Sequence, residues 1–300
     1  MTERARVLVT GANGHLGRRL VSHLAGEHHV HAVVRSEPAR RQLEELPDIA
    51  DIETSVLDYR DSQALTEAAR ESTHAVHLVG IIKESSRSRY EDAHEATTRA
   101  LSAAADACGM KRIVYLSILG ADVASPNPCL ASKARAERTL LEARTPTLIL
   151  RVPMVLGEND FASSALKRRA QASVNVLLRT QSREQPIYAG DVIAAIGEGL
   201  ERPGLDDVIL NLAGPESLPR HQLIRRAGQF TGNAPHAFSV PLGIGLAAAL
   251  VLERVSGNPP ITRAMLGVLD HDDDIDPTDA VKRLGIELTS LDETLRRCIS

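Results

Sequence analysis

The chain has 300 residues, of which 43% are hydrophobic and 25% are charged. This is enough for one large or two modest domains with real cores, and it excludes a disordered or collagen-like chain. The 35 basic and 39 acidic residues give a net charge of −4, so the bulk charge does not favour nucleic acid or an anionic membrane surface as a partner. Only 2% of the residues are aromatic and none is Trp, which disfavours readers of single-stranded nucleic acid that stack bases on aromatic rings.

The cysteines and the apolar runs indicate the cellular compartment and whether the chain is expected to cross a membrane. Cys108, Cys129 and Cys298 lie far apart and form no CxxC or Cys/His ligand pattern, so we expect reduced thiols, no metal site and a cytoplasmic protein. The N-terminus enters the run Val7-Leu8-Val9 without the long apolar segment of a secretory signal. The longest apolar run, residues 242–252, is shorter than the roughly 20 residues that span a bilayer. We therefore expect a soluble chain without an integral membrane segment.

The first half of the chain alternates short β-branched runs with amphipathic stretches, which is typical of βαβ units and a parallel sheet. We expect strands at Ala5–Thr10, Val30–Arg35, Ile52–Leu57, Ala75–Val79, Arg112–Ser117 and Thr147–Val152. Between them we expect helices at about Gly14–Ala25, Asp61–Ala69, Tyr90–Cys108 and Leu130–Ala143. Right-handed crossovers turn this order into a doubly wound α/β sheet of the Rossmann type.

After Val152 the alternation gives way to shorter pieces. We expect helices at Asp191–Leu200, Arg220–Thr231, Leu242–Val255, Thr262–Asp270 and Pro277–Leu284, and a strand near Val208–Leu212. The pattern predicts a Rossmann domain over residues 1–155 and a smaller, mainly helical lobe over residues 156–300, with some chain crossing back to the sheet. For the apolar helix at 242–255 three roles stay open: the core of this lobe, the wall of a pocket for an apolar substrate, and a membrane or partner contact.

A glycine-rich turn separates the first strand from the first helix. Gly11, Gly14 and Gly17 follow the strand in a GxxGxxG spacing. The first glycine allows the tight turn, the second lets a pyrophosphate approach the backbone, and the third lets the helix pack on the sheet. The helix N-terminus then holds the phosphates. We expect a nicotinamide dinucleotide here, with Asn13, His15, Leu16 and Arg18 in the same loop.

The end of the second strand decides which dinucleotide is preferred. A carboxylate there would pair with the ribose hydroxyls of NAD, whereas a cation would neutralise the 2′-phosphate of NADP. Arg35 occupies this place, and Arg18 can lean over the same adenosine end, so we expect NADP(H) rather than NAD. The alternative is that both are ordinary surface charges. Asp58, after the third strand, fits an acceptor for the adenine edge or a cap for the next helix.

Motifs along most of the chain carry a resemblance to a known family. They lie at residues 9–18, 78–82, 116–122, 132–133, 150–157, 191–196, 211–216 and 259–263. In these segments the chain resembles the short-chain dehydrogenase/reductase superfamily, in its extended and atypical branches. It is most similar to bacterial relatives of the nucleotide-binding accessory subunit of respiratory complex I. The resemblance implies that Val79, Gly80, Pro153 and Val155 also line the cofactor site.

The reaction of this superfamily uses a Ser, a Tyr and a Lys, with the last two in a YxxxK spacing. The resemblance assigns Ser117 to the residue that bonds the substrate oxygen and Lys133 to the lysine, which also holds the nicotinamide ribose. The ammonium lowers the phenol pKa so that it can shuttle a proton. Four residues before Lys133 stands Cys129, so the expected tyrosine is missing. Cys129 is either a reactive thiol or, as we favour, a small and partly buried substitute.

Few other residues can replace that tyrosine. We expect Tyr115 to lie in the core and Tyr188 to pack between the lobes, while Tyr90 is either part of a flap over the site or an anchor for the following helix. His15 and His94 could face the cleft but are read as satisfied polar residues.

The sequence favours an NADP(H)-binding atypical member that lacks the catalytic tyrosine and acts as a redox-inactive or weakly active binding, regulatory or assembly module. The alternative is an NADP-dependent oxidoreductase or isomerase, epimerase-like, acting on an apolar carbonyl or quinone-like substrate. It would use Ser117 and Lys133 with a substitute proton donor. The expected partners are the nicotinamide dinucleotide and possible apolar small molecules, with peripheral membrane contact left open and no nucleic acid.

Overall fold

A seven-stranded parallel sheet forms the centre of the computed structural model, which describes residues 4–46, 52–86, 88–255, 262–268 and 272–300. Its strands are β1 (Arg6–Thr10), β2 (His29–Val34), β3 (Glu53–Val56), β4 (His74–His77), β5 (Arg112–Ile118), β6 (Thr147–Val152) and β11 (Val208–Asn211). They lie in the order β11-β6-β5-β4-β1-β2-β3. The order reverses between β1 and β4, and ligands of such sheets bind at the carboxyl ends of the strands beside that point.

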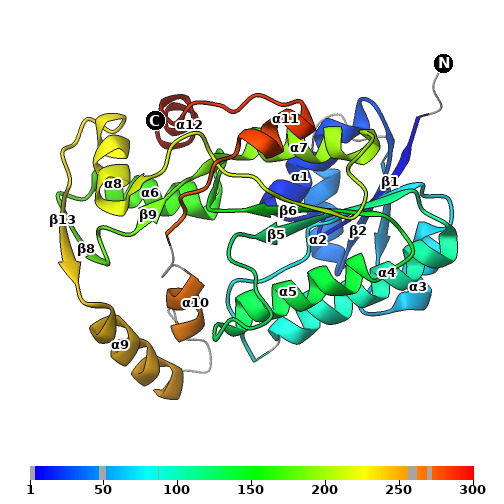
Figure 1. Cartoon of the computed structure of the whole chain (residues 1–300), viewed down its shortest axis with the longest axis horizontal. Coiled ribbons are helices and arrows are strands. Elements are labelled where there is room, and N and C mark those ends of the chain that lie inside the picture. Colours follow the sequence, from blue (N-terminus) through cyan, green and yellow to red (C-terminus); the bar gives the residue numbers. More distant parts are fainter. Residues whose placement is uncertain (1–3, 47–51, 87, 256–261, 269–271) are drawn as a thin grey trace.

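Helices cover both faces of this sheet (Figure 1). One face carries α1 (His15–Ala25), α2 (Glu37–Glu44), α7 (Ala189–Glu201) and α11 (Thr278–Leu284), and the other carries α3 (Ser62–Ala69), α4 (Thr97–Cys108) and α5 (Pro128–Leu141). Successive strand residues point to opposite faces. In β5, Val114 therefore joins the first core, whereas Ile113 and Tyr115 join the second. The doubly wound α/β fold predicted from the alternation is confirmed.

The C-terminal part is mostly helical, as predicted. Its helices are α6 (Phe161–Gln171), α8 (Arg220–Gln229), α9 (Leu242–Val255), α10 (Arg263–Val268) and α12 (Leu291–Ile299). Three short strand pairs accompany them: β7 (Val155–Leu156) with β10 (Ile187–Tyr188), β9 (Arg183–Glu184) with β12 (Leu218–Pro219), and β8 (Val174–Leu178) with β13 (His236–Val240). A third core joins α6, α8 and α12, while α9 and α10 lie at one end of the molecule (Figure 1).

Several predicted boundaries change in the structure. The predicted helix Tyr90–Cys108 begins with a π-helix, η1 (Glu91–Ala96), before α4. The helices α2, α6 and α12 were not predicted. Of the predicted helix Thr262–Asp270, residues 269 and 270 lie outside the described residues, as does most of the motif at 259–263. The domain boundary at residues 155 and 156 stays a prediction, although β11 pairs with β6 in the main sheet.

His77 closes β4 inside the core. Its Nδ1 lies 2.6 Å from Thr10 Oγ1 and its Nε2 lies 3.3 Å from Thr97 Oγ1. The ring stacks on Tyr115 with 5.5 Å between centroids. Burial lowers the pKa of His77 to about 3, so the imidazole is neutral at physiological pH and ties β1, β4 and α4 together by hydrogen bonds.

This buried histidine predicts a dependence of stability on pH. Since the unfolded chain binds a proton on His77 near pH 6.5 and the folded chain does not, the free energy of unfolding falls as the pH drops below that value, by about 1.4 kcal/mol per pH unit. We expect His77→Asn to lose less stability than the natural chain between pH 7 and 5, as measured by urea denaturation. The exposed His29 supplies the control, His29→Asn. Equal losses in all three proteins would contradict this assignment.

Candidate cofactor and active site

The turn after β1 depends on Gly11 and Gly17, two positions that do not tolerate a side chain. Gly11 has a φ of 78°, and its carbonyl accepts a hydrogen bond from the Gly14 amide at 3.1 Å. A Cβ on Gly17 would lie 2.3 Å from the Gly11 oxygen and 2.6 Å from the Ala12 oxygen. The first turn of α1 therefore packs on this loop only because Gly17 lacks a side chain.

The same turn leaves room for a diphosphate. Gly14 is the N-cap of α1, and no side chain caps this helix, so the amides of its first turn are available to an anion. Gly14 and His15 are exposed, while Asn13, Leu16 and Arg18 are half-buried. This arrangement of accessible backbone and a close-packed helix fits the pyrophosphate of a dinucleotide.

The two glycines can be separated by experiment. Gly17→Ala should lower the melting temperature, because its Cβ collides with two backbone oxygens. Gly14→Ala should keep the fold, because its Cβ meets the Gly11 oxygen at a tolerable 3.3 Å, but it should weaken NADPH binding by obstructing the phosphate. Thermal unfolding and NADPH fluorescence titration of both variants test this. Unchanged affinity in Gly14→Ala would place the diphosphate elsewhere.

Tyr59 organises the end of the site where the adenosine is expected. Its hydroxyl accepts a hydrogen bond from the Gly11 amide at 3.1 Å and donates one to the Val33 carbonyl at 2.9 Å. The Arg35 guanidinium lies over the Tyr59 ring, with Cζ 5.8 Å from the centroid. Sequence reasoning missed Tyr59, although its place directly after the third strand could have suggested it.

The charged residues near the expected adenosine end differ in whether they already have a partner of opposite charge. Asp58 accepts hydrogen bonds from Arg60 Nη2 at 2.7 Å and Nε at 3.1 Å, and these bonds hold the pKa of the Asp58 carboxyl below its usual value. Within the described chain, Arg18 and Arg35 form no ion pair with a carboxylate. The Asp58 carboxylate, on which Arg35 also acts electrostatically, is thus already paired with Arg60, whereas Arg18 and Arg35 have no carboxylate within ion-pair distance in the described ranges.

Lys133 lies at the other end of the site, beneath the segment that follows β4. Its Nζ donates to the Tyr115 hydroxyl at 3.1 Å and to the Leu116 carbonyl at 2.9 Å. A Cβ on Gly80 would come within 3.1 Å of Nζ, so the structure brings these two predicted residues together. Burial lowers the pKa of Lys133 to about 8. The hydrogen bond that Lys133 donates to Tyr115, a core residue as expected, was not predicted.

Other predicted residues border the same crevice. Val79 is buried directly after β4, and Pro153 and Val155 follow β6 as half-buried residues. His94 reaches the segment after β4 from η1, with Nε2 3.1 Å from the Ile81 amide nitrogen. Burial lowers its pKa to about 3, so it is a neutral acceptor for that amide.

The Ser117 hydroxyl and the Cys129 thiol both donate hydrogen bonds to other groups of the protein. The Ser117 hydroxyl donates to Glu137 Oε1 at 2.5 Å, and Glu137 also binds Arg151. The Cys129 thiol is buried and donates to the Ile81 carbonyl at 3.7 Å. Burial raises the pKa of Cys129 to about 11, which makes the thiol a poor source of thiolate at neutral pH.

The remaining tyrosines are also engaged. Tyr90 packs against Cys129 and Leu130, and its hydroxyl donates to the Ile82 carbonyl at 2.7 Å. Tyr188 donates to Glu158 Oε1 at 2.6 Å, away from these residues. Tyr90 is therefore the tyrosine that the structure places beside the position from which the superfamily's tyrosine is missing, and it anchors the loop after β4.

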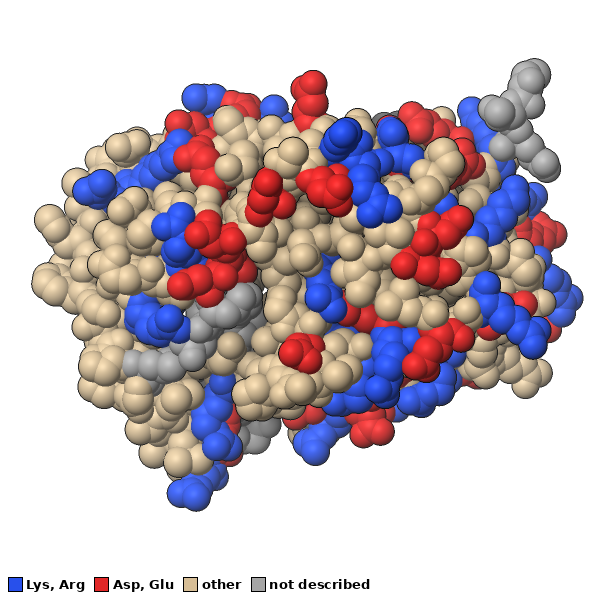
Figure 2. Space-filling view, in the orientation of Figure 1, with Lys and Arg blue, Asp and Glu red and all other residues tan. Residues whose placement is uncertain are grey.

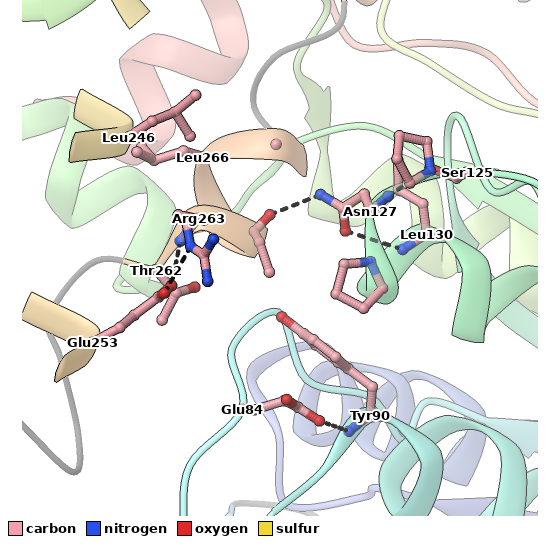
Figure 3. A pocket seen from close by; sticks show the side chains of 14 residues that line it. Glu84, Tyr90, Ser125, Asn127, Leu130, Leu246, Glu253, Thr262, Arg263 and Leu266 are labelled. Carbon is pink, nitrogen blue, oxygen red and sulfur yellow. Dashed lines mark hydrogen bonds and ion pairs between the residues drawn. The ribbon is translucent and has the colours of Figure 1, made fainter. Parts of the chain in front are cut away.

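A cavity of about 790 Å³ adjoins Tyr90 (Figure 3). The first turn of α5, including Asn127 and Leu130, forms one wall, and α9 and α10 form the opposite wall. Asn127 Nδ2 donates to the Ala264 carbonyl at 2.9 Å, which holds α10 to α5. The volume of this cavity is in the range of small-molecule sites.

The surface charges, the clusters of possible metal ligands and the helix lengths bear on which other partners the chain can have. On the face shown in Figure 2, basic and acidic side chains are interspersed without a large field of one sign. In the described ranges, no group of three His, Cys, Asp or Glu side chains is arranged to hold a metal ion. The helices described here include none with the length and apolarity to cross a membrane.

Comparisons with known proteins agree with this geometry. The chain is 28% identical over 247 residues to NADH dehydrogenase (ubiquinone) 1 alpha subcomplex subunit 9, mitochondrial, of Arabidopsis thaliana, covering 80% of this chain and 61% of that protein. It therefore spans less than two thirds of that relative. It is 29% identical over 253 residues to a ceramide reductase of Caulobacter vibrioides, covering 83% of this chain and 78% of that one.

A solved structure shows the same fold. The Bordetella bronchiseptica enzyme WbmG in complex with NAD and UDP has a TM-score of 0.75 and 16% identity, covering 99% of this chain and 93% of the other. The predicted similarity to the accessory subunit of complex I is confirmed, and the WbmG structure shows that the fold is shared. Residues 11–187 match the NAD(P)H-binding family. Since this match begins in the glycine turn and takes in more than half of the sequence, the chain belongs to that family.

Proposed function

We propose that this chain binds NADP(H) and works as a redox-inactive or weakly active binding, regulatory or assembly module of the atypical short-chain dehydrogenase/reductase group. The observation that carries this proposal is the state of Cys129 at the position of the expected tyrosine. Its thiol is buried, bonded to a carbonyl and raised in pKa to about 11. A group in this state transfers protons poorly near neutral pH.

The cofactor would be held along the carboxyl ends of β1 and β4. The first turn of α1 would take the diphosphate, Arg18 and Arg35 the 2′-phosphate, and the Lys133 ammonium the nicotinamide ribose. The residues have the charges and the accessible backbone for this, since α1 begins without a side-chain cap and Gly14 and His15 are exposed. NADPH, when bound, supplies a hydride at its nicotinamide ring. The reduced state of the cysteines supports a cytoplasmic location as part of the same proposal.

Proton transfer to a substrate is the step that these side chains support least. Ser117 donates to Glu137, Tyr90 donates to Ile82, and the Tyr115 hydroxyl lies fully buried against Lys133. The Ser117 and Tyr90 hydroxyls would have to leave their acceptors before they could reach a substrate, and the Tyr115 hydroxyl, which accepts from Lys133, would have to leave the core. The site therefore supports binding of a reduced cofactor better than turnover.

One observation favours the second candidate, an NADP-dependent oxidoreductase or epimerase-like isomerase acting on an apolar carbonyl or quinone. The cavity beside Tyr90 can hold a substrate. Lys133, with its pKa lowered by burial to about 8, is close to the range of a general acid. In this case Lys133 or Tyr90 would replace the missing tyrosine.

Cofactor preference can be tested at Arg35. Arg35→Ala should weaken NADPH binding by about tenfold or more, because a charge-assisted contact to the 2′-phosphate is lost, and it should leave NADH binding nearly unchanged. Fluorescence titration with both cofactors measures this. The exposed Arg41 on α2 gives the matched control Arg41→Ala. An equal effect of Arg35→Ala on both cofactors would show that the 2′-phosphate is bound elsewhere.

Turnover distinguishes the two candidates. We expect NADPH binding with no hydride exchange to a panel of ketones, aldehydes and quinones, and we expect Cys129→Ala to leave cofactor affinity unchanged. NADPH absorbance under single-turnover conditions is the measurement. Turnover that disappears in both Ser117→Ala and Lys133→Met would rule out the inactive module and establish the oxidoreductase.

A further inference from the structure

We infer that the cavity between α5, α9 and α10 is a binding site for an uncharged, partly aliphatic ligand, and that the ion pair between Glu253 and Arg263 sets this selectivity. The inference deepens the proposed function, because it names the class of molecule that would lie beside the cofactor. It concerns a compartment that is separate from the glycine turn and can be tested without turnover.

The cavity combines apolar walls with a few polar groups. Leu130 on α5, Leu246 on α9 and Leu266 on α10 line it from different sides (Figure 3). Tyr90 closes it on the side of Cys129, against which it packs. An aliphatic chain that enters between the leucines would therefore have its other end near the residues that adjoin Gly80 and Lys133.

The charges of the lining decide which ligands are excluded. The charged residues that line the cavity in the described ranges are Glu84, Glu253 and Arg263. Glu253 accepts hydrogen bonds from Arg263 Nε at 2.8 Å and from the Arg263 amide at 2.7 Å. The Arg263 guanidinium is thus already neutralised, and the other carboxylate, Glu84, is itself paired with Arg89, whose Nε lies 3.7 Å from its Oε1.

An anionic ligand would find no free cation in this lining. A carboxylate or a diphosphate that leaves water needs a paired positive charge, since an unpaired buried ion costs several kcal/mol or more. Glu84 also accepts a hydrogen bond from the Tyr90 amide at 2.8 Å, so both carboxylates of the lining are held by protein donors and neither leaves a cation free for such a ligand. Nucleoside diphosphates and fatty acids are therefore disfavoured.

The polar groups suit a neutral ligand. The Asn127 Oδ1 accepts from the Cys129 and Leu130 amides, and Nδ2 donates one of its two hydrogens to the Ala264 carbonyl, which leaves the second hydrogen for another acceptor. The hydroxyl oxygens of Ser125 and Thr262 accept from backbone amides, and each hydroxyl still has a proton to donate. A carbonyl or hydroxyl oxygen can accept such a bond without bringing charge.

The absence of Trp from the chain allows a direct test. Leu246→Trp puts the sole indole in the cavity wall, and Val251→Trp, on the same helix but 59% exposed, is the matched control. The probes are 2-undecanone, undecanoate of the same chain length, and UDP-glucose. We expect 2-undecanone to shift the emission of Leu246→Trp saturably and that of Val251→Trp not at all. Undecanoate should bind at least about tenfold more weakly, and UDP-glucose should have no effect.

A second variant tests the role of the ion pair. Adding Glu253→Gln to Leu246→Trp frees the Arg263 charge, so undecanoate should gain about tenfold in affinity while 2-undecanone changes by less than about twofold. If the Trp variant fails to fold, calorimetry of the natural chain with the same probes replaces the fluorescence measurement. Undecanoate or UDP-glucose binding as tightly as the ketone, or no binding of any probe, would overturn the inference. NADPH titration of the same proteins tests the cofactor proposal separately.

Discussion

The missing side chain at Gly17 is the constraint on which the site depends. With any Cβ at this place, the first turn of α1 would collide with the carbonyl oxygens of Gly11 and Ala12. Because α1 can pack this closely, its uncapped first turn lies over the end of β1, at the point where the strand order of the sheet reverses. The uncapped amides of the helix and the carboxyl ends of β1 and β4 are thus brought to one place by a single residue.

The buried Lys133 ammonium lies at the other end of the proposed cofactor site. It is fixed by the Tyr115 hydroxyl and the Leu116 carbonyl, and the lack of a side chain at Gly80 keeps the space beside it open. A lysine held in this way can bind hydroxyl groups of a cofactor. The groups that would complete proton transfer, in contrast, are bonded to the protein itself, so cofactor binding and catalysis are separable properties of this fold.

Much of the fold followed from the sequence because alternating β-branched runs and amphipathic stretches dictate a parallel α/β sheet, and the glycine spacing is constrained by backbone geometry. Val7 to Thr10 and the three glycines were sufficient to place the glycine turn between the first strand and the first helix. The helix α6 was not predicted, since its burial depends on packing against α8 and α12, which are distant in sequence. The π-helical start before α4 likewise depends on the tertiary contact of His94 with Ile81.

The candidate site was predictable only where residues act through their type and spacing. Lys133 and Cys129 could be identified from a four-residue interval, but the partners that define their states could not. Tyr115 bonds to Lys133 across a strand and a helix, Tyr59 bonds to Gly11 from the far side of the sheet, and Glu137 binds the hydroxyl of Ser117. Such contacts are set by the three-dimensional register of strands and helices, which no local pattern encodes.

A crystal structure of the chain with NADP⁺ tests the central claim most directly, because it shows both ends of the cofactor at once. The account predicts the diphosphate on the first turn of α1, the 2′-phosphate in contact with the guanidinium of Arg35 or Arg18, and the nicotinamide ribose within hydrogen-bond reach of Lys133 Nζ. It also predicts that Cys129 remains bonded to the Ile81 carbonyl. A 2′-phosphate that contacts neither arginine, or a ribose remote from Lys133, would contradict it.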